Sequence, residues 1–306
     1  MRRFYRSWPV GLLAGLLLAG FGAAAAEPVK VVATFSILGD MIKSVAGDRI
    51  ALTTIVGGDG DSELYQPTPG DAKAVAEAKL LVMNGLNEEF EPWLDGLVKQ
   101  ANFRGAKLVA SKGVKPMSEA DEKGEGKDAA KLDQHAWHDV ANAIIYVRNI
   151  ADGLAKADPA NAAEYRGRAD AYAKELRELD GWAKGEIAAV PKAKRKVITS
   201  HDAFQYLARA YGVTMIAARG WSNEREASAE DVARLLKQIR QDRVKAIFVE
   251  NMNDPRLIQR IAQEAGATIG GTLYSDSLSK PGGEADSYVK MVHHNIAALK
   301  EAMLKN

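Results

Sequence analysis

Cysteine is absent from this chain of 306 residues. Its absence excludes disulfide bonds, and it excludes a lipid attached through an N-terminal cysteine. We therefore expect the mature protein to be free in solution. A chain without disulfides must be stabilised by its hydrophobic core, and this length is enough for one large or two ordinary domains.

A surplus of charge of either sign is also lacking. The chain has 41 Lys and Arg residues against 40 Asp and Glu residues. A nearly neutral protein has no general attraction for nucleic acid. We expect no nucleic-acid partner.

The N-terminal 26 residues are typical of a secretory signal peptide. Arg2, Arg3 and Arg6 precede an apolar run at 10–21, and small residues then lead to Ala26. The run is shorter than a membrane-spanning helix and a cleavage site follows it. We therefore expect export, cleavage after Ala26, and a bacterial periplasm as the location.

Two series of alternating strands and helices fill the mature chain, which predicts an α/β fold with parallel sheets and helices on their faces. The first series occupies residues 30–110 and the second residues 196–304. Predicted strands cover 30–35, 52–56, 80–84, 107–110, 196–199, 214–217, 246–250 and 267–273; predicted helices cover 37–45, 71–78, 91–100, 140–156, 203–211, 228–241, 255–265 and 287–304. The charged segment 112–132 has no periodicity and is predicted to be a surface loop.

One long helix is predicted between the two series, from Asp158 to Ile187. Its apolar residues recur at steps of three and four, Asp158 suits the N-cap, and Pro159 suits the first helical position. Such a helix would be a strut between an N-terminal lobe at 27–157 and a C-terminal lobe at 191–306, with the connection at 158–190. The alternative is a surface helix of one large domain.

Four loops that follow predicted strands carry residues able to ligate a metal ion. In open α/β sheets, ligands bind beyond the carboxyl ends of the strands. Two candidates come from each half of the chain: Glu63, His135, His201 and Asp276. Taken singly, each is as compatible with a cap or a satisfied polar group. The chain has only five histidines, and two of them occupy such loops in different halves. This favours a metal site between the lobes.

The other three histidines are weaker candidates for metal ligands. His138 lies three residues after His135 and is a candidate partner for it on a helical turn, with a helix surface as the alternative. His293 and His294 lie in the last predicted helix, where we expect solvated rings.

Sequence motifs of common catalytic sites are missing. The chain has no His-Glu-x-x-His helix, no Gly-x-Ser-x-Gly elbow and no glycine-rich phosphate loop. Four protein ligands would complete a tetrahedral shell, whereas a catalytic zinc keeps a position open for water. We therefore expect no enzyme; the alternative is a metal-dependent hydrolase.

Several local motifs resemble those of the bacterial periplasmic solute-binding proteins that supply zinc or manganese to ABC transporters. The resemblance covers essentially all of the mature chain. It rests on the segments Ala33-Thr34-Phe35-Ser36-Ile37-Leu38-Gly39-Asp40, Tyr65-Gln66-Pro67-Thr68-Pro69, His135-Ala136-Trp137, Thr199-Ser200-His201-Asp202-Ala203-Phe204, Phe248-Val249-Glu250-Asn251 and Gly271-Thr272-Leu273-Tyr274-Ser275-Asp276-Ser277-Leu278-Ser279.

The resemblance implies two lobes joined by one rigid helix, with a transported Zn²⁺ or Mn²⁺ held between them at the positions of Glu63, His135, His201 and Asp276. It also implies delivery to a membrane permease. We expect a monomer that binds one ion. A cell-adhesion or scaffold protein with a degenerate metal site is a further alternative.

Two departures from the family affect the choice of metal. The family usually has histidine at the position of Glu63, and many zinc-binding members have a histidine-rich loop where this chain has 118–131 without histidine. Both departures favour manganese, whereas His201 is typical of the zinc-binding members. Glu63 either ligates as a carboxylate or points away from the site.

Overall fold

The computed structural model describes residues 27–118, 132–218, 228–242 and 244–306. The predicted signal peptide and most of the predicted loop at 112–132 lie outside these residues. Across the described ranges, none of the helices combines the length and the hydropathy needed to cross a bilayer.

Two parallel four-stranded sheets form the framework, as predicted. The first has the order β2-β1-β3-β4 and the second the order β6-β5-β7-β8. The strands are β1 (Val29–Phe35), β2 (Ile50–Val56), β3 (Leu80–Met83), β4 (Ala106–Val109), β5 (Lys196–Thr199), β6 (Thr214–Ala217), β7 (Ile247–Glu250) and β8 (Ile269–Leu273). In each sheet the strand order changes direction between the two central strands, which opens a crevice at their carboxyl ends.

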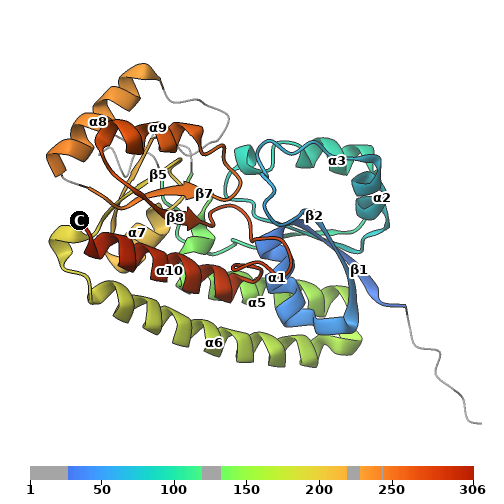
Figure 1. Ribbon diagram of the computed structural model, residues 1–306. Coiled ribbons are helices and arrows are strands. Elements are labelled where there is room, and N and C mark those ends of the chain that lie inside the picture. Colours follow the sequence, from blue (N-terminus) through green and yellow to red (C-terminus); the bar gives the residue numbers. More distant parts are fainter. Residues whose placement is uncertain (1–26, 119–131, 219–227, 243) are drawn as a thin grey trace, which may run out of the picture.

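Helices cover the faces of both sheets (Figure 1). They are α1 (Ser36–Ala46), α2 (Pro69–Glu77), α3 (Leu94–Gln100), α5 (Val140–Ala157), α6 (Ala162–Ala188), α7 (Gln205–Tyr211), α8 (Ala229–Asp242), α9 (Arg256–Ala265) and α10 (Tyr288–Leu304).

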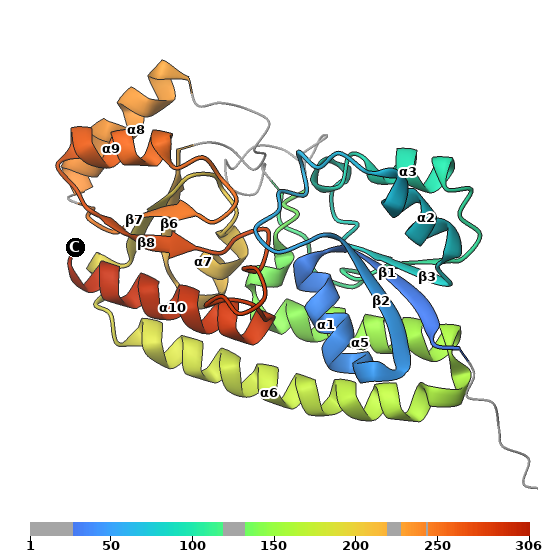
Figure 2. The ribbon, with the colours of Figure 1, turned by 45° about the vertical axis from the view of Figure 1, so that its right-hand side comes forward.

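The predicted long helix is α6, with 27 residues. At about 1.5 Å per residue it extends roughly 40 Å. It packs against α1 and α5 of the first half and against α10 of the second, and Figures 1 and 2 show it running beneath both sheets. The helix therefore braces both halves along its length.

The start of this helix differs from the prediction. A 3-10 turn at Pro159–Asn161 precedes it, and Asp158 makes no N-cap hydrogen bond. Instead the Asp158 carboxylate accepts hydrogen bonds from the Tyr165 hydroxyl at 2.6 Å and the Asn161 side chain at 2.7 Å. Asp158 thus fastens the turn to the beginning of the helix through side chains rather than capping its backbone.

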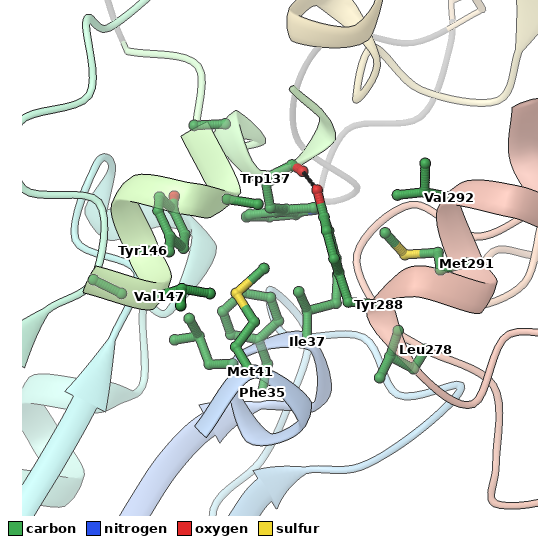
Figure 3. Close-up of a cluster of buried hydrophobic side chains, with 14 of the residues drawn as sticks. Phe35, Ile37, Met41, Trp137, Tyr146, Val147, Leu278, Tyr288, Met291 and Val292 are labelled. Atoms are coloured by element: carbon green, nitrogen blue, oxygen red, sulfur yellow. Dashed lines mark hydrogen bonds between the residues drawn. The ribbon is translucent and has the colours of Figure 1, made fainter. Parts of the chain in front are cut away.

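The two halves share a hydrophobic core beneath the crevice. Figure 3 shows Phe35, Ile37 and Met41 of the first half facing Leu278 and Tyr288 of the second, and all five are buried. A common core of this kind disfavours large movements of one half against the other.

Candidate metal centre

Each of the four predicted site residues lies in a loop at the carboxyl end of a sheet. Glu63 follows β2, His135 follows β4, His201 follows β5, and Asp276 follows β8. All four side chains are buried. Buried ionisable groups require partners or an ion, because their desolvation is costly.

Three of the four converge. One ligand atom from each of His135, His201 and Asp276 lies within 4.8 Å of the other two. His135 Nε2 is 3.4 Å from Asp276 Oδ1, and His201 Nε2 is 3.2 Å from Asp276 Oδ2. Within the described part of the chain neither Nε2 atom makes a hydrogen bond. Two imidazole nitrogens and a carboxylate facing one point fit a divalent transition metal.

Carboxylates behind the two histidines fix their orientation. Asp133 Oδ1 lies 2.8 Å from His135 Nδ1, and Glu250 Oε2 contacts His201 Nδ1. When Nδ1 donates its proton to a carboxylate, Nε2 presents its lone pair to a metal. Both rings are thereby directed into the centre.

Glu250 has several further contacts. It accepts hydrogen bonds from the backbone N–H of Ser200 at 2.8 Å and of His201 at 3.0 Å, and from the Ser275 hydroxyl at 2.9 Å. Glu250 therefore fixes the loop of His201 and also holds Ser275, the residue before Asp276. We did not predict a role for Asp133 or Glu250; the available signals were a carboxylate two residues before a histidine and a glutamate ending a strand.

The charges of the centre depend on one another. Burial by itself lowers the pKa of His135, but the charges of Asp276 and Asp133 outweigh it and raise the pKa. Burial likewise lowers the pKa of His201, while Glu250 and Asp276 raise it well above the ordinary value. Burial raises the pKa of Asp276, and the two histidines lower it overall. Without an ion, the neighbouring carboxylates therefore favour the protonated form of both imidazoles.

Glu63 does not belong to this group of three. Its Oε1 accepts a hydrogen bond of 2.6 Å from Gln134 Nε2, in the residue before His135. The Trp93 indole N–H donates to the Ser62 carbonyl at 2.8 Å and holds the same loop. The fourth predicted residue therefore lies beside the centre, bonded to the loop of His135.

The expectation that His138 lies on a helix surface is wrong. Its side chain is buried, and its ring packs on Phe204 with centroids 4.6 Å apart. Burial first, and then the charge of His135, lower its pKa to about 3. His138 is thus a neutral core residue, and it lies outside the group of three.

The two remaining histidines differ from each other. The His293 ring is exposed, as predicted, and packs on Trp182 at 4.1 Å. The His294 ring is half-buried, with Nε2 2.9 Å from the Thr272 carbonyl oxygen. The prediction of a solvated ring is therefore wrong for His294.

Comparison with known proteins identifies the family. Residues 31–302 match the family described as "ZnuA: Zinc-uptake complex component A periplasmic". The chain belongs to this zinc-uptake component family. Its curated relatives include the manganese ABC transporter substrate-binding lipoprotein PsaA of Streptococcus pneumoniae, which is 35% identical over 303 residues, covering 97% of this chain and 96% of the relative. The metal ABC transporter substrate-binding lipoprotein FimA of Streptococcus parasanguinis is 35% identical over 300 residues, covering 96% of each.

Solved structures of similar proteins share the fold. The periplasmic zinc-binding protein TroA from Treponema pallidum superposes with a TM-score of 0.83 at 28% identity, covering 90% of this chain and 99% of that chain. The manganese-bound periplasmic metal-binding protein from Candidatus Liberibacter asiaticus gives a TM-score of 0.79 at 30% identity, covering 90% of this chain and 100% of that chain. The two-lobe architecture with a long connecting helix is thus common to these proteins.

Proposed function

We propose that this protein captures one divalent transition metal ion, Zn²⁺ in the first place and Mn²⁺ as the alternative, and delivers it to the permease of an ABC transporter. The observation that carries the proposal is the convergence of one ligand atom each from His135, His201 and Asp276, all buried, within 4.8 Å of one another. Imidazole favours zinc over manganese, and a carboxylate suits either ion.

Capture rather than catalysis follows from the burial of the ligands. His135, His201 and Asp276 have no exposed surface, so an ion among them has no open path to a bulky substrate. With Glu63 as the fourth ligand, the shell is tetrahedral and leaves no position for a reactive water. We therefore propose no enzymatic activity.

The family supports the proposed partner and location. The relatives named above are substrate-binding components of metal ABC transporters, which supports a membrane permease as the partner and the periplasm as the location. Those relatives are named lipoproteins, whereas this chain has no cysteine for lipid attachment. We propose a monomer with lobes at 27–157 and 191–306 that hold the ion between them.

A competition titration tests this function. The metal-stripped protein is titrated with Zn²⁺ and Mn²⁺ against a calibrated chelator. We expect one tight equivalent that His135→Ala and Asp276→Ala weaken by at least about 100-fold, because each removes a direct ligand. His293→Ala, which changes an exposed ring that packs on Trp182 and is not one of the candidate ligands, is the matched control. Absence of stoichiometric binding, or equal affinity in all variants, would refute the proposal.

A further inference from the structure

The residue two positions after Asp276 is bonded to the first half through both of its main-chain groups. The Leu278 N–H donates to Ser36 Oγ at 3.0 Å, and the Leu278 carbonyl accepts a hydrogen bond of 2.8 Å from the Asp59 N–H. The Leu278 side chain lies in the shared core (Figure 3). The segment that follows Asp276 is therefore held by the first half, although β8 belongs to the second.

One side chain joins this segment to the loop after β2. Asn251 follows β7, and its Nδ2 donates to Asp59 Oδ1 at 3.0 Å and to Ser277 Oγ at 3.0 Å. Asp59 belongs to the first half and Ser277 to the second, so a single amide is bonded to both. The bond to the carboxylate is charge-assisted, and such bonds are stronger than those between neutral groups.

The main chains of the two segments also lie close together. A Cβ atom added to Gly58 would lie 2.3 Å from the Ser279 carbonyl oxygen and 2.8 Å from the Lys280 backbone nitrogen. Both distances are well below the contact distance of about 3.5 to 4.0 Å between non-bonded atoms. A side chain at position 58 would therefore push the two segments apart. At the neighbouring Gly57, an added Cβ would meet nothing within 4 Å.

Departure of an ion from the centre requires a local movement. The shared core disfavours large movements of one half against the other, and the ligands His135, His201 and Asp276 have no exposed surface. An ion among them can leave only when one of their loops moves. The loop of Asp276 can move away only if the bonds to Asp59 and Asn251 break.

We propose that Asp59 and Asn251 form a latch between the two halves that slows the departure of the bound ion. The inference rests on the proposed function. Both are positioning residues, because neither belongs to the converging ligands and both act by holding the loop of Asp276. The latch sets the rate at which the protein gives up the ion and leaves the ligands themselves unchanged.

Exchange of the two polar groups tests the latch. Asn251→Asp places a second carboxylate against Asp59, so that a hydrogen bond becomes a repulsion between like charges. Asp59→Asn in the same chain restores an amide facing a carboxylate, with the direction of the hydrogen bond reversed. We expect Asn251→Asp to raise the dissociation rate of Zn²⁺ by at least about tenfold, because a hydrogen bond to a charged group is worth at least that factor. The exchanged pair should recover most of the loss.

The dissociation rate is measured by mixing the Zn²⁺-loaded protein with an excess of a chromogenic chelator in a stopped-flow instrument. A rate that does not depend on the concentration of chelator reports the departure of the ion itself. The rate of association should be unchanged, because no ligand is altered. Asn102→Asp, which adds the same charge at an exposed position after α3, is the control and should keep the wild-type dissociation rate.

A second pair of variants decides the matter if Asn251→Asp does not fold. Gly58→Ala forces the two segments apart without changing a polar side chain, and it should also accelerate dissociation. Gly57→Ala has room for its methyl group and is the matched control. Equal dissociation rates in these two variants would then overturn the latch.

The outcomes separate this inference from the proposed function. A wild-type protein that binds neither ion overturns both. A wild-type protein that binds one equivalent, together with an unchanged dissociation rate in Asn251→Asp, overturns the latch alone. So does a rapid dissociation that Asp59→Asn fails to reverse, because Asn251→Asp would then act through the adjacent Glu250, which holds His201.

Discussion

The Tyr288 hydroxyl donates a hydrogen bond of 2.6 Å to the backbone carbonyl of Trp137. Tyr288 begins α10 in the second half, and Trp137 lies two residues after His135 in the first (Figure 3). The Trp137 indole in turn donates to the Ser275 carbonyl at 2.9 Å, next to Asp276. The loops of two candidate ligands are therefore tied to each other through Trp137.

Removal of the Tyr288 hydroxyl should destabilise the whole protein. Tyr288→Phe leaves the buried Trp137 carbonyl without its donor, which costs about 1 to 3 kcal/mol of unfolding free energy. Urea denaturation of the metal-free protein measures the change. Tyr274→Phe is the control, because its hydroxyl makes no hydrogen bond with the described residues. Equal losses in both variants would contradict a specific role for the Tyr288 hydroxyl.

Metal affinity should fall as the pH falls. The pKa values of His135 and His201 are raised in the metal-free protein, so these imidazoles keep a proton to a higher pH than usual, whereas a bound metal requires neutral imidazoles. Binding therefore releases protons, and lower pH opposes it. We expect weaker affinity at pH 5.5 than at pH 7.5.

Calorimetry checks this release of protons. The apparent binding enthalpy, measured in buffers with different ionisation enthalpies, gives the number of protons that leave when the ion binds. An affinity that is the same at both pH values, with no release of protons, would show that the imidazoles are already neutral.

The sequence predicted the strands and helices better than the side-chain contacts around the candidate metal centre. Strands and helices were found because apolar residues recur with regular periods, as Tyr165 and Ile187 do along α6. The loops of His135, His201 and Asp276 were found because parallel strands present their carboxyl ends together. Both inferences use short stretches of sequence.

The errors concern contacts between distant residues. Position 138 looked like a surface turn, but Phe204, from the other half, covers its ring. Glu250 looked like the polar end of a strand, yet its carboxylate contacts His201, 49 residues earlier. Glu63 accepts a hydrogen bond from the side chain of Gln134, 71 residues later. No local period or spacing records such pairs, because the folded core creates them.

His138 should make the protein sensitive to acid. Its pKa is lowered to about 3 in the folded state, chiefly by burial. An unfolded chain takes up a proton on this histidine below its ordinary pKa of about 6.5, so folding stability is lost as pH falls from there toward the folded pKa, by about 1.4 kcal/mol per pH unit.

His138→Leu should remove this loss. The unfolding free energies of wild type and variant, both metal-free, are compared by urea denaturation at several pH values between 7 and 5. We expect the difference to move in favour of the variant as pH decreases, while His293→Leu on the exposed ring keeps a constant difference from wild type. Parallel pH profiles for wild type and His138→Leu would mean that His138 is protonated within the fold.

Glu250→Gln should weaken metal binding, although Glu250 is not one of the candidate ligands. The carboxylate holds His201 Nδ1 and accepts two backbone N–H groups and the Ser275 hydroxyl. An amide in its place offers one acceptor oxygen and removes the charge that raises the pKa of His201. We expect the affinity for Zn²⁺ to fall by about 10- to 100-fold at neutral pH.

The dependence of this affinity on pH should become shallower in Glu250→Gln, because His201 then holds its proton less strongly. Glu186→Gln, which removes a half-buried ion pair with Lys300, is the control. An affinity loss with an unchanged pH profile would assign Glu250 a role in the shape of the loop rather than in the charge of His201.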